Sequence, residues 1–600
     1  MSLCFIRFTL TLLLLCKNLY AADCPLLSQA FPPPRMLSSS STWKKAIEDF
    51  ESNLKELLSQ STDLDARTTS FSINIFSSHE ENLLYGYHHD APGLKGSIAK
   101  GQKLNGDTMY RIASISKVMT LYTFLIEAGF KYFNEPVAKF VPEIEREIQR
   151  QWGNLDDTLV SQWREITVGS LASQLSGIGR DYYNDMASRV NQTVTTQFGL
   201  PALSDSEIPR CGQRGPHFDP CTRRDMFAEF IGRHPVFAPF STAIYSNVAF
   251  DIIGYALEQI TNVPFKKSVK RSIIDRLKLK RFGVETPPAT WGIIPSDPVT
   301  SYWNASVGSG NPAVGFYSSA SDLARVGQSI LQSRLISETD TRRWLKPNSH
   351  TSSLLSSVGS PWEIYRSSSP RLVDFYTKFG DLGSYGSAIA LIPDYDVGFT
   401  VLAAGANPGR QRTLLADLIG SLLSATLEKE ARIQAIEAFA GTYTSPYNEN
   451  DMTTVVKISD EKDSAGPGLA IDSFYLNGVS FEDLVGAFIG EPRGTFPKVG
   501  LRLQPTGLTA RYANRSRGSV RSRTSFRVIA DIPEPGANNN MTKEKIFSGP
   551  CKTWMSIDGL RYGGRSIDEL VFELDGAGKA VALEMRITQQ TLLRTDGGSP

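Results

Sequence analysis

A serine and a lysine three residues apart, Ser114 and Lys117, open a long apolar stretch of the chain. In a helix, residues i and i+3 lie on one face, so the Lys117 amine can reach the Ser114 hydroxyl. A helix N-terminus also supplies N–H groups and positive potential where an oxyanion would form. The same Ser-x-x-Lys pattern starts at Ser41, Ser52, Ser97 and Ser459. Only Ser114 directly follows a strand-like Met-Tyr-Arg-Ile, so we predict Ser114 as a nucleophile and Lys117 as its catalytic partner.

A Tyr-Ser-Asn triplet at Tyr245 offers a second pair of reactive groups. A phenolate stabilised by two lysines can take the serine proton, and the Asn247 amide can donate to a substrate carbonyl. Other Tyr-x-Asn triplets begin at Tyr132, Tyr182, Tyr302, Tyr475 and Tyr512. Only Tyr245 follows Pro239 in FAPFSTAIYSN and precedes a strongly helical segment. This triplet is therefore the second candidate element, with Tyr245 and Asn247 as its reactive side chains.

A Lys-Phe-Gly triplet at Lys378 is the third candidate element. Lys378 would add positive charge, and Gly380 would let substrate approach the backbone closely. A backbone N–H near Asp381 would be a second donor to an oxyanion. Lys498-Val499-Gly500 has the same pattern but falls in the C-terminal region. Whether Lys117 or Tyr245 is the working base stays open, because two such groups can titrate as a unit.

The elements that must position these groups are of mixed type. Apolar residues at helical spacing predict helices over 43–58, with Ser41 or Thr42 as N-cap, and over 114–129, 249–261 and 412–439. Alternation predicts a strand over 68–77 and a hairpin over 388–404, with a loop-rich stretch over 180–240. After Gly441 the chain shows short strand-like segments at 453–458, 469–474 and 524–532. We expect an α+β catalytic domain over 44–440 and an all-β domain over 441–600.

The N-terminus has the pattern of an export signal. Arg7 precedes a short apolar run over 8–16, and small residues follow at Ala21 and Ala22. Lys17 interrupts the run well before the roughly 20 residues that a membrane span needs. We predict a signal peptide over 1–21, a Pro/Ser-rich leader over 22–43, and a secreted protein that keeps no membrane anchor after cleavage.

Cysteine usage is consistent with export. Four cysteines remain after the signal, an even number that fits two disulfides in an oxidising compartment. Cys211 and Cys221 bracket a short Gly/Pro-containing loop and are the expected pair; Cys24 with Cys551 would follow by elimination only. Sequons for N-glycosylation start at Asn191, Asn304, Asn514 and Asn540.

The composition is that of a soluble globular protein, with 41% hydrophobic and 21% charged residues. A net charge of +1 gives no reason to expect nucleic acid as a partner. Six histidines without CxxC or HExxH, and the lack of a P-loop or GxGxxG, predict no metal and no nucleotide cofactor. We expect a small molecule or short peptide as substrate; the sequence leaves the oligomeric state open.

Beyond these short motifs, three longer stretches of the chain carry a resemblance to a known family: DTMYRIASISKVMTLYTFLIEAG, ITVGSLASQLSGI and NPAVGFYSSASDLARVGQSIL. Over about residues 106–405 the chain resembles the serine β-lactamase and penicillin-binding-protein family, in its branch of class C β-lactamases, esterases and D-aminopeptidases. With its signal and β-rich tail it is similar to secreted fungal β-lactamase-like proteins. The resemblance implies an antiparallel sheet flanked by helices, an all-helical subdomain, and hydrolysis through an acyl-enzyme. It also implies that Tyr245 is catalytic and that the substrate-binding residues are Asn247, Lys378, Gly380 and Asp381.

Three residues depart from the family pattern. Gln174 stands where His is usual, Phe240 where Gly usually follows Pro239, and Phe379 where Thr is common. The resemblance implies that Phe379 lacks a hydroxyl that often meets a substrate carboxylate, which argues against a β-lactam preference. Two alternatives to hydrolysis stay open: an acyltransferase or thioesterase of secondary metabolism, and a catalytically inactive binding homologue.

Overall fold

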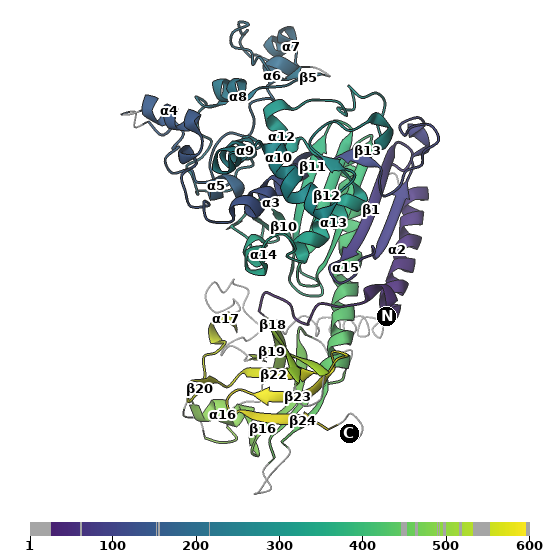
Figure 1. Cartoon of the computed structure of the whole chain (residues 1–600), viewed down its shortest axis with the longest axis vertical. Coiled ribbons are helices and arrows are strands. Elements are labelled where there is room, and N and C mark those ends of the chain that lie inside the picture. The colour runs from purple at the N-terminus through teal and green to yellow at the C-terminus, as the bar shows by residue number, and fades with distance from the viewer. Residues whose placement is uncertain are drawn as a thin grey trace, which may run out of the picture. The chain divides into compact units, whose positions relative to one another are not determined.

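The computed structural model of the chain (Figure 1) divides into two compact units, residues 35–426 and residues 427–600 with the segment before residue 35. It describes residues 26–60, 63–151, 153, 156–214, 217–445, 453–461, 466–488, 490, 492–495, 500–514, 519–531 and 553–595. Cys24, Cys551, Asn540, Lys498 and the predicted signal over 1–21 lie outside the described residues. Those predictions therefore stay predictions.

The unit over 35–426 is built on an eight-stranded antiparallel sheet of order β2-β1-β13-β12-β11-β10-β9-β8. Its strands are β1 Thr69–Ser77, β2 Tyr85–His89, β8 Ser349–His350, β9 Ser356–Val358, β10 Glu363–Ser367, β11 Val373–Leu382, β12 Tyr385–Ile392 and β13 Val397–Gly405. Every residue of β1 and of β12 is buried, as expected of central strands covered on both faces. The predicted strand over 68–77 and the hairpin over 388–404 are confirmed.

Helices cover both faces of this sheet. Gly327 of α13 (Ala320–Leu331) lies against the Phe76 ring, and Gly386 of β12 lies against the first residues of α15 (Pro408–Phe439). Gly386 aligns with Phe71 through β13, and Phe71 and Phe76 point to opposite faces because strand side chains alternate. The same alternation decides on which face of the sheet each β11 side chain lies. Only the β11 side chains on one face can therefore reach Ser114, the candidate nucleophile.

A helical subdomain packs beside the sheet (Figure 1). Its elements include α3 Ser116–Ala128, α4 Pro142–Arg150, α5 Val168–Ala172, α6 Met186–Arg189, α7 Gln192–Gln197, α8 Arg223–Phe230, α9 Val248–Thr261, α10 Phe265–Val269 and α12 Asn311–Val314. The first ten residues of both α3 and α9 are buried, which explains why each stretch holds a single charged residue, Lys117 in α3 and Asp251 in α9. The antiparallel sheet with flanking helices and a helical subdomain confirms the predicted α+β fold class.

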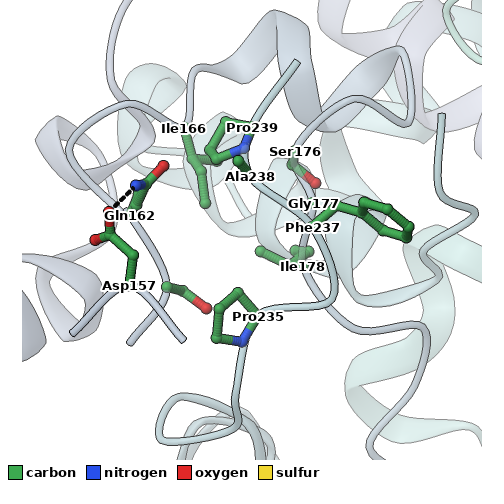
Figure 2. Close-up of a pocket in the computed structure, with 11 residues that line it drawn as sticks. Asp157, Gln162, Ile166, Ser176, Gly177, Ile178, Pro235, Phe237, Ala238 and Pro239 are labelled. Atoms are coloured by element: carbon green, nitrogen blue, oxygen red, sulfur yellow. Dashed lines mark hydrogen bonds between the residues drawn. The ribbon is translucent and has the colours of Figure 1, made fainter. Parts of the chain in front are cut away.

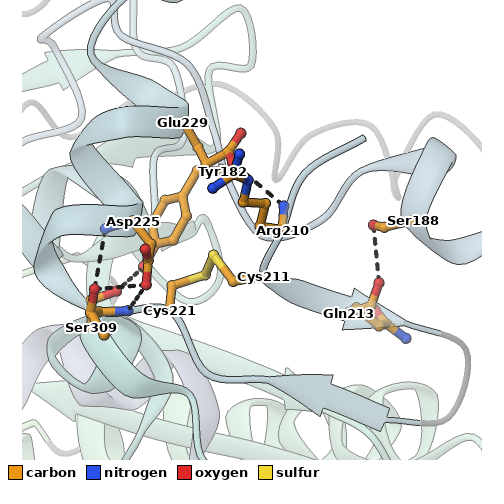
Figure 3. Close-up of a disulfide and its surroundings, with 10 residues drawn as sticks. Tyr182, Ser188, Arg210, Cys211, Gln213, Cys221, Asp225, Glu229 and Ser309 are labelled. Carbon is orange, nitrogen blue, oxygen red and sulfur yellow. Dashed lines mark hydrogen bonds between the residues drawn. A yellow bond between two sulfur atoms is a disulfide. The ribbon is translucent and has the colours of Figure 1, made fainter. Parts of the chain in front are cut away.

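The expected disulfide joins Cys211 and Cys221, and it also fixes the neighbouring chain (Figure 3). The Cys221 carbonyl accepts a hydrogen bond from Ser309 N–H at 2.8 Å, and the Ser309 hydroxyl lies 2.5 Å from the Tyr182 hydroxyl. The bridge therefore holds the turn that leads directly into α12.

The second unit is a barrel. Strands β14 Gly441–Thr444, β15 Val455–Ile458, β16 Leu469–Leu476, β18 Gly500–Asn514, β19 Ser519–Asp531, β22 Glu569–Leu574, β23 Ala580–Met585 and β24 Gln590–Arg594 pair in chain order, and β15–β16 pairing closes the ring. Phe439, at the end of α15, packs edge-on against Phe526 and Phe572 with ring centres 5.0 Å from each. The all-β character predicted for the C-terminal region is confirmed, with the short helices α16 (Phe481–Phe488) and α17 (Thr553–Ser556) added.

Some element ends differ from the sequence prediction. Helix α2 spans Ser41–Gln60, and its cap is Ser40, whose hydroxyl accepts the Trp43 N–H at 3.2 Å. The predicted caps, Ser41 and Thr42, lie inside the helix because the cap occupies the last non-helical residue. None of the helices in the described residues has both the length and the apolar character that a bilayer crossing requires.

Candidate active site

Ser114 lies in a tight turn between β3 (Met109–Arg111) and α3. Ala113, directly before it, has φ of 43°, a left-handed conformation that few residues with a side chain adopt. The turn is anchored by a hydrogen bond from Ile112 N–H to the Phe316 carbonyl at 3.1 Å. Ser114 is half-buried and lies two residues before the regular helix, so its N–H is among the groups that a helix start leaves for other acceptors.

Lys117 is fully buried, and its Nζ lies within hydrogen-bond distance of three oxygen atoms. Its Nζ lies 3.1 Å from Ser114 Oγ, 2.6 Å from Asn247 Oδ1 and 3.0 Å from the Ala313 carbonyl. A neutral amine has two hydrogens and one lone pair. If both carbonyls accept a hydrogen, the lone pair points at the Ser114 hydroxyl, which is the arrangement a base requires.

Tyr245 reaches the same hydroxyl from a distant part of the chain. Its Oη lies 2.8 Å from Ser114 Oγ, and the Lys117 Nζ lies 5.0 Å from the centre of its ring. The structure therefore brings Ser114, Lys117 and Tyr245 together although 131 residues separate the serine from the tyrosine.

The surroundings shift both basic groups toward their deprotonated forms. Burial lowers the pKa of Lys117, and the nearby charge of Lys378 lowers it further. Burial opposes ionisation of Tyr245, but the positive charges of Lys117 and Lys378 outweigh it and hold the pKa of the phenol below its usual value. Each group stabilises the charged form of the other, so the pair titrates as a unit.

Lys378 on β11 supplies permanent positive charge. Its Nζ lies 5.2 Å from the centre of the Tyr245 ring and pairs with Glu363, the first residue of β10. Burial lowers the pKa of Lys378, but Glu363 and Tyr245 outweigh it, so the pKa is raised and the lysine stays protonated. Glu363 was not found from the sequence, because only strand pairing places it beside Lys378.

Gly380 and Asp381 form the edge of the site on β11. A Cβ on Gly380 would lie 2.5 Å from the Ile112 carbonyl and 2.7 Å from Ser114 N, so no larger residue fits there. The Phe379 N–H donates to Glu363 Oε2 at 3.0 Å, on the side of β11 away from β12. Because N–H directions alternate along a strand, the Asp381 N–H also points to that side, beyond the last residue that β10 pairs.

Asn247 lies where it holds Lys117. Its Oδ1 accepts from Lys117, while its Nδ2 donates to Asp181 Oδ1 at 2.7 Å. Beneath it, Asp251 is wholly buried, and burial raises the pKa of this carboxyl well above its usual value. Neither Asp181 nor Asp251 was predicted. Asp251 is the one charged residue in the apolar run that begins α9, and this is a signal that could have found it.

The turn before Tyr245 depends on two of the residues that depart from the family pattern. Gln174 and Phe240 have φ of 63° and 64°, and the Gln174 carboxamide oxygen accepts the Ser246 N–H at 2.6 Å. A cavity of about 50 Å³ beside this turn, lined by Ile166, Ser176, Gly177, Phe237 and Pro239 among others, is shown in Figure 2. It is far smaller than the several hundred Å³ of ligand sites, so it belongs to the packing of the turn.

Three of the four predicted glycosylation sites lie in the described residues. Asn191 and Asn304 are exposed, and Asn514 is the last residue of β18. Glycosylation at these positions stays a prediction.

Two family models match the chain. The Beta-lactamase family matches residues 79–424, and the family described as "Beta-lactamase-like-like, C-terminal domain" matches residues 431–596. The chain is 28% identical to the "Beta-lactamase-like protein" of Arthroderma benhamiae, covering 94% of each chain. It is 24% identical to the "Probable hydrolase clz13" of Cochliobolus lunatus, covering 96% of this chain and 92% of that one.

Solved structures of similar proteins include a D-stereospecific amidohydrolase from Streptomyces sp., with 19% identity and a TM-score of 0.44 over 60% of this chain and 97% of that one. Another is a β-lactamase/D-alanine carboxypeptidase from Yersinia pestis complexed with citrate, with 16% identity and a TM-score of 0.44 over 60% of this chain and 94% of that one.

Proposed function

The chain belongs to the β-lactamase family, and on that premise we propose that it is a serine hydrolase acting through a covalent acyl-enzyme on an ester, amide or lactam. One observation carries the proposal: Ser114 Oγ lies within hydrogen-bond distance of both Lys117 Nζ and Tyr245 Oη. A hydroxyl beside a buried amine and a phenol with lowered pKa is an activated nucleophile.

In the acylation step the Ser114 oxygen attacks the substrate carbonyl while its proton passes to the Lys117–Tyr245 pair. The carbonyl oxygen gains negative charge, which the backbone N–H groups of Ser114 and Asp381 would stabilise. The bond to the leaving group then breaks, and Tyr245 returns the proton to that group. The products of this step are an ester on Ser114 and the free alcohol or amine.

Deacylation reverses these roles. A water molecule loses a proton to the same pair and attacks the ester carbon, the bond to Ser114 Oγ breaks, and the serine recovers its proton. Lys378 keeps the local potential positive throughout, which favours each state in which Tyr245 or the carbonyl oxygen carries negative charge.

Covalent labelling tests the assignment. A fluorophosphonate probe should form a bond from Ser114 Oγ to phosphorus with loss of fluoride, visible by peptide mass spectrometry. Ser114→Ala should lose both labelling and ester hydrolysis, while Ser52→Ala, which alters an exposed serine of another Ser-x-x-Lys, should keep both. Substantial turnover by a folded Ser114→Ala protein would refute the proposal.

Export is a second part of the proposal. It rests on the charged and apolar pattern of residues 1–21 and on the Cys211–Cys221 disulfide, since disulfides persist in oxidising compartments. Expression of the full chain in a fungal host should give mature protein in the medium, with an N-terminus near Ala22. Retention of residues 1–21 on intracellular protein would contradict it. Enzymatic deglycosylation of the secreted form tests the four sequons.

A further inference from the structure

Three basic side chains that lie close to the Tyr245 ring or to the edge of β11 are each paired with a carboxylate. The pairs are Lys378 with Glu363, Arg180 with Asp181 at 3.3 Å, and Arg412 with Asp381 at 3.1 Å. Lys117 is bonded to protein acceptors and has a lowered pKa because it is buried. A substrate carboxylate would therefore have to compete with a protein carboxylate for each of these three cations.

Arg412 pairs with Asp381 beside the free edge of β11. Its side chain is 6% exposed, and it donates from Nε to the Gly409 carbonyl at 3.1 Å and from Nη1 to the Ser387 carbonyl at 3.3 Å. Its Nη2 lies 3.2 Å and 3.1 Å from the two carboxylate oxygens of Asp381. Asp381, by contrast, is 59% exposed, so a molecule at this edge meets the carboxylate before it meets the guanidinium.

Phe379 adds an apolar surface beside the same pair. Its ring contacts the Arg412 guanidinium, 4.3 Å from the ring centre, and the Tyr365 ring, 5.8 Å away at an interplanar angle of 34°. Phe379 and Tyr365 are both partly exposed. The aromatic surface covers the guanidinium on one side, and the Asp381 carboxylate covers its Nη2.

These side chains lie where the substituent of an acyl group would pass. Gly380 abuts Ser114 N, and the neighbouring residues Phe379 and Asp381 project from the opposite side of the strand at its free edge. An acyl carbonyl held between the N–H groups of Ser114 and Asp381 would direct its substituent along this edge. A carboxylate on that substituent would face Asp381 at short range, whereas a neutral chain would contact the Phe379 ring.

We propose that the Asp381–Arg412 pair, with Phe379, makes this site selective for acyl donors that carry no negative charge. The inference rests on the proposed function and names its substrate class: neutral, apolar esters or amides, with carboxylate-bearing donors excluded. Asp381 acts here as a specificity-determining residue, because it occupies the guanidinium that a substrate carboxylate would otherwise bind.

Two esters with one leaving group test the proposal on the full-length protein. p-Nitrophenyl valerate and mono-p-nitrophenyl glutarate differ in little but a terminal carboxylate. The wild type should prefer the neutral ester by about a hundredfold in kcat/KM, since like charges at short range strongly disfavour binding. Asp381→Asn should shift the ratio toward the anionic ester by about tenfold or more, because it removes the repelling charge and frees the Arg412 donor.

Two further variants isolate the cause. Asp381→Asn combined with Arg412→Met should lose the gained activity on the anionic ester, since no guanidinium remains to bind the carboxylate. Asp417→Asn removes an exposed carboxylate from the same helix and should leave the ratio within about threefold of wild type.

The outcomes separate this inference from the proposed function. Labelling of Ser114 together with equal wild-type rates on the two esters, or an unchanged ratio in Asp381→Asn, would overturn the selectivity and leave the hydrolase assignment intact. Failure of Ser114 to react with the fluorophosphonate, with neither ester turned over, would overturn both. Because the wild-type ratio is itself a test, the inference stays falsifiable even if a variant does not fold.

Discussion

Replacing Lys378 by methionine should move the rising limb of the pH–rate profile to higher pH. Lys378 is 1% exposed, and its positive charge lowers the pKa of both Lys117 and Tyr245. Methionine keeps much of the length and volume of the side chain but carries no charge. Both pKa values should therefore rise, and the charge of Glu363, left without its partner, acts in the same direction.

The geometry sets the size of this shift. The Lys378 Nζ lies 5.2 Å from the Tyr245 ring centre. Two unit charges at that separation interact by about 3 kcal/mol at an effective dielectric constant of 20. That energy corresponds to about two pKa units, and solvent near the half-buried Ser114 will reduce it to between about one and two. At neutral pH the variant should lose about tenfold to a hundredfold in kcat/KM.

The assay is kcat/KM for a neutral p-nitrophenyl ester as a function of pH, since this quantity reports the groups of the free enzyme. Removing both charges with Lys378→Met and Glu363→Gln should give a smaller shift than Lys378→Met alone. Lys266→Met, which removes a half-exposed lysine paired with the exposed Glu285, should leave the profile unmoved. A folded Lys378→Met enzyme whose limb stays in place, or moves to lower pH, would refute this electrostatic account.

Three further predictions address stability and the backbone of the site. Because the pKa of Asp251 is raised, the folded chain keeps a proton that the unfolded chain releases above about pH 4. The contribution of this residue to stability therefore falls as pH rises. In thermal denaturation, the stability of Asp251→Asn relative to wild type should increase with rising pH. Replacing Cys211 and Cys221 together by alanine should cost about 2–3 kcal/mol of unfolding free energy in urea, because the bridge closes a ten-residue separation. Gly380→Ala should lower kcat/KM by about a hundredfold or more, since the new Cβ would lie 2.7 Å from Ser114 N.

Each of these has a matched control. Asp417→Asn, which removes an exposed carboxylate, should not show the gain in relative stability with rising pH that is expected of Asp251→Asn. Wild type unfolded in the presence of a reductant should match the double alanine variant. Gly232→Ala adds a Cβ that meets no atom within 4 Å and should keep full activity. A pH-independent Asp251→Asn difference, a double alanine variant as stable as oxidised wild type, or a fully active Gly380→Ala enzyme would each contradict the corresponding argument.

Several features followed from sequence because they depend on local pattern. Apolar periodicity placed α9 at 249–261, where the structure has Val248–Thr261, and the hairpin around Pro-Asp-Tyr-Asp became β12 and β13. The short loop between Cys211 and Cys221 identified the disulfide. In each case the residues that interact are near one another in the chain, so spacing alone carries the information.

The reactive groups were also named from sequence, but their relation in space was not. Ser114 and Lys117 share one helical turn, so their contact is local. Tyr245 lies just before α9 and Lys378 lies on β11, and only folding brings them close to the same hydroxyl. The spacing within a motif names candidate residues. Long-range packing decides which of these candidates meet in one site.

What the sequence determined by itself is the α+β and all-β division of the chain, the nucleophile candidate and the cysteine pair, since these depend on neighbours along the backbone. What only the tertiary structure decided is the charge state of the site. Strand pairing and helix packing place four charged residues beside groups of the site: Glu363 beside Lys378, Asp181 beside Asn247, Asp251 beside Lys117 and Arg412 beside Asp381. The sequence alone shows none of these contacts. Electrostatic interactions depend on distance and on exclusion of water, and both are properties of the folded chain.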